Sequence, residues 1–442
     1  MKKLSSRIVF AVTILGMLMI LTISGGIYVS GPTNQSLQNL EDSPVTLHTK
    51  ADNYALQWSI TWGGAGSDIG YGVAVDANGS IYCTGLTSFG AGLALFKFAP
   101  NGTRLWNLTW SGASYGYGYG KQVAVDASGA IYCTGVTYPG AGNGDLALVK
   151  FAPNSTRLWN RTWGGVYADY GYGVTVDASG SILCTGATYY GFGAEDDPDL
   201  ALVKFAPNGT QLWSTTWGGS YAEAGQDVAV DANGSIYCTG STVSFSQLGG
   251  TEEQDDIDLA LVKFAPNGTR LWNITWNEKW SDIGYGVAVD ANGFIYCHGD
   301  GSGQPVLLKY TPNGAPSSLG MSGNTGGYGV AADAGGSIYC CGTTGTDMVL
   351  VKLAPNGTRL WNLTWGGAWH EVCYGVAVDA SGSIYCIGGN NISTSTSDMV
   401  LYKFSTVSTS DGIPGFEFAV LLIGVLALLG LGYRRRLDRT TS

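Results

Sequence analysis

Five carboxylates recur at one fixed position along this chain, and their spacing suits the binding of a metal ion. Each stands eight residues before an Asp that repeats through the sequence. A ring of carboxylate oxygens is a ligand set that a hard cation such as Ca²⁺ takes. A hydrogen bond repeated between neighbouring units is the alternative, and we favour it over the cation. The five residues are Asp68, Asp169, Glu223, Asp282 and Glu371.

A second group of candidate residues lies in the variable segments between the repeats. Two of these segments, 195–199 and 252–256, are acidic, and others are rich in aromatic residues. Aromatic rings beside carboxylates suit a sugar, because its apolar ring face stacks while its hydroxyl groups donate to acceptors. An ordinary solvated loop is the alternative. The predicted ligand-binding residues are Tyr117, Tyr170, Trp280, Trp369, Asp196, Asp197, Glu252 and Glu253.

The catalytic motifs in the sequence are incomplete. Segment 370–374 begins like the zinc motif H-E-x-x-H but has no second histidine. Segment 112–116 matches G-x-S-x-G, but no helix is expected after it to form a nucleophile elbow. The loops hold enough Asp and Glu for glycoside chemistry, yet no spacing singles out a pair. We therefore expect a binding protein more than an enzyme and predict no catalytic residue.

The candidate residues belong to a repeat that the sequence shows directly. A block that runs from an Asp to a Cys, as in VDANGSIYC, occurs seven times. The Asp residues follow one another at intervals of 50, 51, 54, 59, 43 and 46 residues. A period of this size with strand-like content predicts a β-propeller in which each repeat forms one blade. The repeated residues are Asp76, Asp126, Asp177, Asp231, Asp290, Asp333 and Asp379.

Each repeat contains the signals of four short strands. In the first repeat, apolar runs at 72–76 and 80–84 are joined by Asn-Gly, and runs at 93–98 and 103–110 are joined by Pro-Asn-Gly. Such turns are typical of β-hairpins, because proline fixes φ and glycine accepts a positive φ. No segment between residues 54 and 405 shows helical periodicity. The predicted fold is all-β, a seven-bladed propeller of four-stranded blades over residues 54–405.

The two ends of the repeat region predict how the ring closes. The seventh repeat lacks its last, tryptophan-containing strand, and a strand of that type stands alone at 54–62, before the first repeat. We expect 54–62 to complete the seventh blade, which removes an open edge from the ring. The fifth repeat has no tryptophan in 313–319, so we expect its outer strand to be short or irregular.

One Cys of every repeat falls on the second strand of its blade. Equivalent positions in neighbouring blades should lie too far apart for a disulfide, which needs Cα atoms within about 7 Å. We expect buried free thiols that act as small apolar side chains. Cys341 and Cys373 lie outside this pattern, and the sequence leaves open whether they pair.

Hydrophobic segments flank the predicted propeller. Residues 1–30 are basic and then apolar, which predicts a signal peptide or signal anchor, and 31–53 is a polar linker. A Ser/Thr linker at 406–412 precedes an apolar segment at 413–436 that ends in three arginines, and 437–442 would be a cytoplasmic tail. We expect a hydrophobic helix at each end, and the positive-inside rule places the propeller outside the membrane.

The repeat resembles the bacterial and archaeal β-propeller repeat called SBBP. The sequences VDANGSIYCTG, DLALVKFAPN and RLWN carry the resemblance, which spans residues 54 to about 405 and implies a propeller but little about function. A weaker similarity is to PQQ-type propellers. Pro414-Gly415-Phe416, the apolar run and the arginines together resemble the archaeal PGF-CTERM sorting signal. That resemblance implies cleavage by an archaeosortase and attachment of a lipid, and a plain anchoring helix is the alternative.

Charge and strand direction complete the prediction. The net charge is −11, which argues against nucleic acid partners, and frequent Asn-x-Ser/Thr sequons are typical of a glycoprotein. The two tight turns of every blade lie on one face, which we name the turn face. The longer connections lie on the opposite, loop face. Both terminal linkers should leave from the turn face, which would then lie toward the membrane.

These observations predict a membrane-anchored binding module on the cell surface. Its ligand would be a glycan or a protein on the loop face, and Ca²⁺ is the one candidate cofactor. A structural envelope protein without a discrete ligand is the first alternative. An extracellular carbohydrate-active or PQQ-like enzyme is the second. Selective ligand binding favours the module, self-association favours the structural protein, and turnover favours the enzyme.

Overall fold

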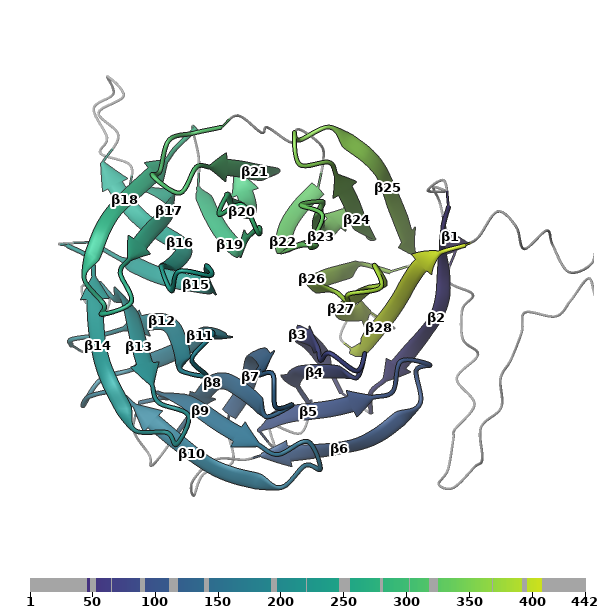
Figure 1. The fold of residues 1–442 in the computed structure, drawn as a ribbon, viewed down its shortest axis with the longest axis horizontal. Coiled ribbons are helices and arrows are strands. Elements are labelled where there is room, and N and C mark those ends of the chain that lie inside the picture. Colours follow the sequence, from purple (N-terminus) through teal and green to yellow (C-terminus); the bar gives the residue numbers. More distant parts are fainter. Residues whose placement is uncertain are drawn as a thin grey trace, which may run out of the picture. The chain divides into compact units, whose positions relative to one another are not determined.

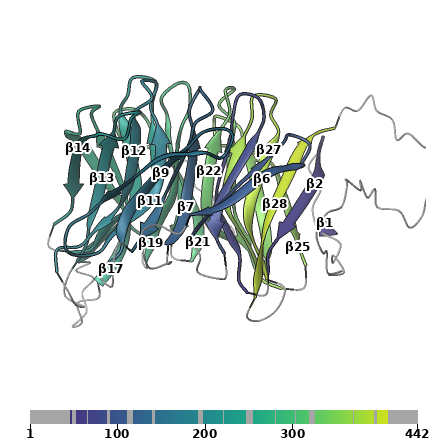
Figure 2. The same ribbon diagram turned by 90° about the horizontal axis from the view of Figure 1, so that it is seen from below.

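The structure is a computed structural model, and it describes residues 46–47, 53–64, 66–87, 92–110, 118–138, 143–191, 197–219, 221–245, 255–278, 281–301, 303–317, 325–367, 369–391 and 396–407. These residues form seven antiparallel sheets arranged as the blades of a ring (Figure 1). Seen from the side, the strands run between two faces that carry the connections (Figure 2). The predicted all-β, seven-bladed propeller is confirmed.

The strands of each blade are lettered A to D from the centre outward, and the blades are numbered in chain order. Strands A are β3 (Ile69–Val75), β7 (Gly118–Val125), β11 (Asp169–Val176), β15 (Glu223–Val230), β19 (Asp282–Val289), β22 (Thr325–Ala332) and β26 (Glu371–Val378). Strands B are β4 (Ile81–Leu86), β8 (Ile131–Thr137), β12 (Ile182–Thr188), β16 (Ile236–Phe245), β20 (Ile295–Gly301), β23 (Ile338–Thr344) and β27 (Ile384–Asn391).

The outer half of each blade is built in the same way. Strands C are β5 (Leu93–Phe98), β9 (Asp145–Phe151), β13 (Asp199–Phe205), β17 (Asp255–Phe264), β21 (Gln304–Tyr310), β24 (Asp347–Leu353) and β28 (Ser397–Thr406). Strands D are β6 (Arg104–Trp110), β10 (Arg157–Trp163), β14 (Gln211–Trp217), β18 (Arg270–Trp276), β25 (Arg359–Gly366) and β2 (Tyr54–Trp62). Blade 5 has three strands and an isolated bridge between Tyr310 and Pro316 among the described residues, as its sequence predicts.

The ring closes as the sequence predicts. β2 pairs with β28, from Tyr54 opposite Thr406 to Trp62 opposite Met399, and so forms strand D of blade 7. The two strand ends also meet, since the Val407 amide donates to the carbonyl of Asn53 at 2.8 Å. The short strand β1 (Thr46–Leu47) adds to the outer edge of blade 6 by pairing with β25.

The hydrophobic core is divided among the junctions between neighbouring blades. Each cluster of buried side chains combines residues of two blades, as where Tyr82 and Leu95 of blade 1 pack with Cys133 and Phe151 of blade 2. Strands B are buried along nearly their whole length, because both of their faces lie against a neighbouring blade. Strands D alternate between exposed and half-buried residues, since only one face is covered.

Repeated polar residues fix the turns and join the blades. In the first A–B turn, Asp76 Oδ1 accepts from the amides of Asn78 and Ser80, both at 2.9 Å, so the Asp caps the turn as predicted. The repeated Lys reaches the next blade, and Lys403 Nζ donates to the carbonyl of Pro100 at 3.0 Å across the closure. The same contact recurs at other junctions.

The hydrophobic segments predicted at 1–30 and 413–436, and the tail at 437–442, lie outside the described residues. Within the described ranges, the structure contains no helix of the length and apolar character needed to span a membrane.

Candidate functional site: the central channel

Every strand A carries a β-bulge at the same position, and the extra residue faces the centre of the ring. In β3, Gly70 pairs with Gly85 and Gly72 pairs with Thr84, which leaves Tyr71 between them. The register shifts at the same place in the other six blades. A bulge re-aims a side chain, and here it sends one residue per blade toward the channel. These bulge residues are Tyr71, Lys121, Tyr172, Gln226, Tyr285, Tyr328 and Tyr374.

A glycine on strand B makes room for each bulge. A Cβ built on Gly186 would lie 1.7 Å from the carbonyl oxygen of Tyr170, and one on Gly85 would lie 2.0 Å from that of Ile69. Separations this short do not occur for a real side chain, so any other residue would displace the bulged strand. The Gly two positions after the repeated Cys is therefore part of the machinery that positions the channel side chains.

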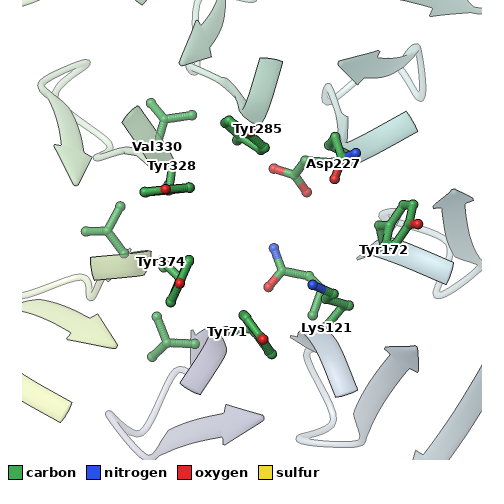
Figure 3. A pocket seen from close by; sticks show the side chains of 15 residues that line it. Tyr71, Lys121, Tyr172, Asp227, Tyr285, Tyr328, Val330 and Tyr374 are labelled. Atoms are coloured by element: carbon green, nitrogen blue, oxygen red, sulfur yellow. The ribbon is translucent and has the colours of Figure 1, made fainter. Parts of the chain in front are cut away.

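Four tyrosines from neighbouring blades form a continuous aromatic wall on one side of the channel (Figure 3). The ring centroids of Tyr285 and Tyr328 are 5.2 Å apart, those of Tyr328 and Tyr374 are 5.0 Å apart, and those of Tyr374 and Tyr71 are 5.2 Å apart. These separations and the tilted planes are typical of favourable aromatic pairs. Lys121 ends the arc, with Nζ 4.2 Å from the centroid of Tyr71.

The other side of the channel is polar. Five blades have glycine at the position after the bulge residue, whereas blade 2 has Gln122 and blade 4 has Asp227. Asp227 accepts from the amide of Val228 at 2.9 Å and from that of Val287, in blade 5, at 3.0 Å. The side chain of Gln122 also contributes a hydrogen bond to this carboxyl. The channel thus has an aromatic wall and, opposite it, a mainly polar wall that also includes Tyr172 (Figure 3).

Burial shifts the ionisation of the channel groups. It raises the pKa of Asp227 to about 6, although the amides of Val287 and Val228 and the side chain of Gln122 favour the charged form. Burial also lowers the pKa of Lys121. Burial and the neighbouring tyrosines raise the pKa of Tyr374 to about 12. The tyrosine hydroxyls therefore stay protonated at neutral pH and can donate hydrogen bonds to a ligand.

The two walls line a cavity of about 130 Å³ that is partly open to solvent. This volume is slightly below the roughly 150 Å³ that accommodates one benzene molecule, so the cavity takes at most one small ring. A ligand in it would contact tyrosine faces on one side and the amide and carboxyl groups of Gln122, Gln226 and Asp227 on the other.

The five carboxylates that the sequence suggested as a ring of metal ligands are buried at blade junctions. Four of the five lie beside an Asp near the start of strand C in the preceding blade: Asp68, Asp169, Glu223 and Glu371. A Cβ built on Gly164 would be 2.5 Å from Asp169 Oδ2 and 3.0 Å from Asp145 Oδ1. The amide of Asp169 also donates across the junction to the carbonyl of Gly144 at 2.7 Å. The structure therefore does not bring Asp68, Asp169, Glu223, Asp282 and Glu371 together around one point.

The junction pairs bury more carboxyl oxygen than their hydrogen bonds satisfy. Glu371 is 2% exposed, and its Oε2 has no hydrogen-bond partner, nor has Oδ1 of Asp398 at the next junction. Burial, and to a smaller extent the charge of Asp347, raises the pKa of Glu371 to about 7, against the amide of Gly367. No group of three or more His, Cys, Asp or Glu suited to a metal occurs among the residues that the structure describes.

Only part of the predicted loop-face site can be placed. Tyr170 is half-buried, and its ring lies 5.8 Å from that of Tyr189 and 6.4 Å from that of Tyr172. Trp369 is 45% exposed in another blade, and Asp197 is exposed. The structure shows no contact among these three. Five predicted residues lie outside the described ranges: Tyr117, Trp280, Asp196, Glu252 and Glu253.

The sequence interpretation missed the bulge residues, although a signal for them exists. Each stands five residues before the repeated Asp, and five of the seven are tyrosine. An aromatic residue at a constant offset would be expected to have a constant environment. The prediction missed Tyr71 because it began strand A at residue 72, whereas the observed strand begins at Ile69 and carries a bulge at Tyr71.

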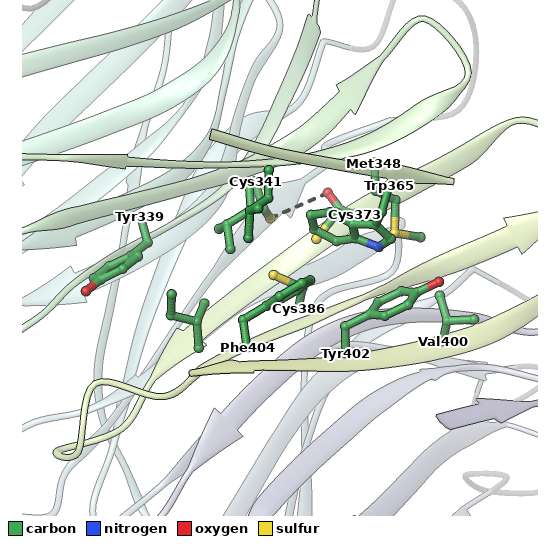
Figure 4. Close-up of a cluster of buried hydrophobic side chains, with 12 residues drawn as sticks. Tyr339, Cys341, Met348, Trp365, Cys373, Cys386, Val400, Tyr402 and Phe404 are labelled. Atoms are coloured by element: carbon green, nitrogen blue, oxygen red, sulfur yellow. Dashed lines mark hydrogen bonds between the residues drawn. The ribbon is translucent and has the colours of Figure 1, made fainter. Parts of the chain in front are cut away.

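The seven repeat cysteines are free and buried, as predicted, and so are Cys341 and Cys373, whose pairing the sequence left open. Cys341, Cys373 and Cys386 lie in the core cluster between blades 6 and 7 (Figure 4). Cys341 Sγ contacts the carbonyl of Cys373 at 3.5 Å, and the two residues are not joined as a disulfide. Burial raises the pKa of all three thiols. They therefore act as apolar core side chains.

Comparison with known proteins agrees with the fold. The family called SBBP, a β-propeller repeat, matches residues 57–90. An uncharacterised WD repeat-containing protein of Acanthamoeba polyphaga mimivirus is 23% identical over 204 residues, which is 37% of this chain and 15% of that protein. The chain thus matches only a small part of the length of this relative.

Two solved structures resemble this chain at low sequence identity. The WD40 domain of Neurospora crassa Pan2 superposes with a TM-score of 0.51 at 9% identity, covering 82% of this chain and 98% of that one. A Dyadobacter fermentans protein of unknown function has a TM-score of 0.49 at 11% identity, covering 80% and 100%. The chain is a seven-bladed β-propeller repeat protein, and its first repeat matches the SBBP family.

Proposed function

We propose that this protein is a cell-surface binding module that holds one sugar unit of a glycan in its central channel. The observation that carries the proposal is the two-sided cavity, with four tyrosine rings opposite Gln122, Gln226 and Asp227. A propeller built from repeats supports an interaction role, and the channel is the place that we propose for it.

Sugar chemistry fits both walls. A pyranose ring presents C–H groups on its faces, which stack on tyrosine, and hydroxyl groups around its edge, which bond to amides and carboxylates. Lys121 and Asp227 bring one cation and one carboxyl to the same small space. Only a ligand that is polar at its edge and apolar on its face uses all of these groups together.

The surface location in this proposal rests on the sequence. The hydrophobic segments at 1–30 and 413–436 support a tethered, extracellular propeller. Processing of the C-terminal segment by an archaeosortase belongs to the same proposal. Mass spectrometry of the protein from its native membrane would test it, because cleavage removes the apolar segment and its arginines.

Binding of the full chain to a glycan panel, with affinities by calorimetry, tests the ligand and its place. Tyr328→Ala removes one ring of the aromatic wall and should weaken binding about threefold to tenfold. Trp369→Ala removes an exposed aromatic side chain of the loop face and should leave the affinity unchanged. The reverse pattern would place the ligand on the loop face, as the sequence alone suggested.

Other outcomes would contradict the proposal that the ligand is a glycan. Binding to a surface protein but to no glycan would retain the interaction role and replace the ligand. Self-association without any other ligand would favour a structural envelope protein. Glycan turnover that is lost with Asp227→Asn would favour an enzyme.

A further inference from the structure

A ring of exposed leucines follows the outer strands of the propeller. In β6, Lys97 pairs with Trp106 and Phe98 pairs with Arg104, so Leu105 is the extra residue of a second bulge. The bulge recurs in β10, β14, β18 and β25. Its leucines are between 52% and 54% exposed, and they make up half of the exposed large hydrophobic side chains in the described part of the chain. They are Leu105, Leu158, Leu212, Leu271 and Leu360.

The leucines all lie at the same height. Each comes three residues after the glycine position of the C–D turn, which belongs to the turn face. Val407, at the end of strand C in blade 7, is 47% exposed at that face too. A lateral partner would touch one or two blades only. A planar partner is the one that touches residues of blades 1, 2, 3, 4 and 6 together.

Charge differs between the two faces. An exposed Arg precedes the leucine in four of the five strands: Arg104, Arg157, Arg270 and Arg359. The repeated Asp and the repeated Lys, one of each per blade, offset one another near this end of the strands. The junction carboxylates lie at the opposite end, where strands A and C begin. The turn face therefore has an excess of arginine, and the loop face has an excess of carboxylate.

The chain ends lie at the same face. Asn53 and Val407, beside each other at the outer edge of blade 7, lead into the polar linkers 31–53 and 406–412 and then into the hydrophobic segments. The linker 406–412 has seven residues and spans at most roughly 25 Å when extended. A propeller on so short a tether has its turn face close to the lipid.

We propose that the turn face rests on an anionic lipid surface, with the five leucines in the headgroup region and the arginines on lipid phosphates. Interfacial binding combines buried apolar area with attraction to anionic lipid in this way. The inference rests on the membrane tether of the proposed function and adds to it a direct contact between the leucines and arginines of the turn face and the lipid.

Site-directed spin labelling of the full chain in phosphatidylglycerol vesicles tests this contact. All nine native cysteines are buried, so one exposed cysteine can be labelled selectively. Leu105→Cys and Leu271→Cys place the label in different blades of the ring. Val166→Cys is the matched control, because Val166 is 77% exposed on the loop face. The accessibility of each label to oxygen, relative to a water-soluble nickel chelate, reports contact with lipid.

We expect this ratio at residues 105 and 271 to be at least about threefold that at residue 166, since an interfacial side chain is buried about 5–10 Å into the headgroup boundary. Changing the four arginines to glutamine, or using phosphatidylcholine vesicles, should reduce the difference. Equal ratios at 105 and 166 in protein that floats with vesicles would overturn this inference alone. Protein that does not float would overturn the tether as well.

A third outcome identifies a different partner. The spectrum at residue 105 could show dipolar broadening that disappears when labelled chain is diluted with unlabelled chain. This result would show contact between copies of the chain and contradict the lipid contact. Glycan affinity of the same labelled proteins should equal that of the unmodified chain. If neither the unmodified chain nor any labelled variant binds a glycan, the channel proposal is contradicted, and the lipid contact is not affected.

Discussion

Buried carboxyls dominate the chemistry of individual residues in this propeller. The junction acids Asp145, Asp169, Glu223, Glu371 and Asp398 all have raised pKa values, with burial as the main cause. Two carboxylates at a junction supply fewer oxygens than the six to eight that Ca²⁺ takes. At the junction of Glu371 and Asp347, a proton on Glu371 relieves the charge and satisfies an oxygen, so we infer that Glu371 is protonated below about pH 7, and the Ca²⁺ site stays a prediction.

Glu371→Gln tests this inference. A carboxyl whose pKa is raised on folding, here from 4.5 to about 7, holds more protons in the native state between those values. The wild type therefore loses stability as pH rises from about 5 to 8. Glutamine removes this loss and should raise the free energy of unfolding at pH 8 by on the order of 1–3 kcal/mol, with little effect at pH 5. Urea denaturation at both pH values measures the difference.

Two controls accompany that measurement. Glu278→Gln changes an exposed glutamate and should leave the pH dependence as it is. His298 is buried, which lowers its pKa to about 4, so it opposes the trend by removing stability as pH falls below about 6.5. It is present in both variants and cancels in the comparison. Stabilisation by millimolar Ca²⁺ at pH 8 that is lost in Glu371→Gln would contradict protonation and show that a metal ion compensates the charge at this junction.

The pKa of Asp227 predicts how glycan affinity in the channel depends on pH. Its pKa of about 6 means that the carboxylate is mostly charged at pH 7 and mostly neutral at pH 5. Hydrogen bonds from ligand hydroxyls to a charged acceptor are roughly twice as strong as neutral ones. Glycan affinity should therefore fall severalfold from pH 7 to pH 5 in the wild type and change little in Asp227→Asn. A variant with the wild-type pH profile would remove Asp227 from the site.

At the scale of elements, the bulges connect sequence to site. Gly186→Ala brings a Cβ against the carbonyl of Tyr170 and should displace the bulge that carries Tyr172. Overpacking of this kind costs about 1–3 kcal/mol, and it should weaken glycan binding as well. Gly165→Ala is the matched control, because its Cβ would meet nothing within 4 Å. Thermal unfolding and calorimetry of both variants measure the two effects.

Strand β2 gives the second prediction at this scale. Deleting residues 54–62 removes strand D of blade 7 and exposes the core around Leu401 and Phe404. The loss of a packed strand should lower stability by several kcal/mol and leave an open edge. Deleting 46–52 instead removes only the two pairs of β1 and should have a small effect. Equal melting temperatures for the 54–62 deletion and the full chain would contradict the closure.

The elements also show which features the sequence could predict and why it could not predict the others. Repeat spacing and turn residues determine the blades, the incomplete fifth blade and the closing strand, because these depend on local signals. The position of Tyr71 depends on a bulge, and that of Glu371 depends on an aspartate of the preceding blade. Register shifts and contacts between repeats depend on tertiary structure, so the channel and the acid pairs could be recognised only in the three-dimensional structure.

For the whole molecule, the ring separates three roles by position. The centre carries the tyrosines, the junctions carry the core and the acid pairs, and the outer strands carry the leucines and arginines. Because each blade repeats one plan, a residue that departs from this plan in one blade gives the ring a local feature that the other blades lack. The channel owes its polar wall to two such residues, Gln122 and Asp227, at a position where the other five blades have glycine.

The closing strand also determines how the molecule responds to mechanical force. β2 and β28 are antiparallel, and Asn53 and Val407 lie side by side at their shared end. Tension that pulls these two ends apart loads the pairs one at a time, beginning at Tyr54 and Thr406, so the strands unzip and do not shear. Unzipping needs little force. If both linkers enter one membrane, however, their anchors move together, and a pull on a glycan in the channel is directed along both linkers toward the lipid and not across this seam.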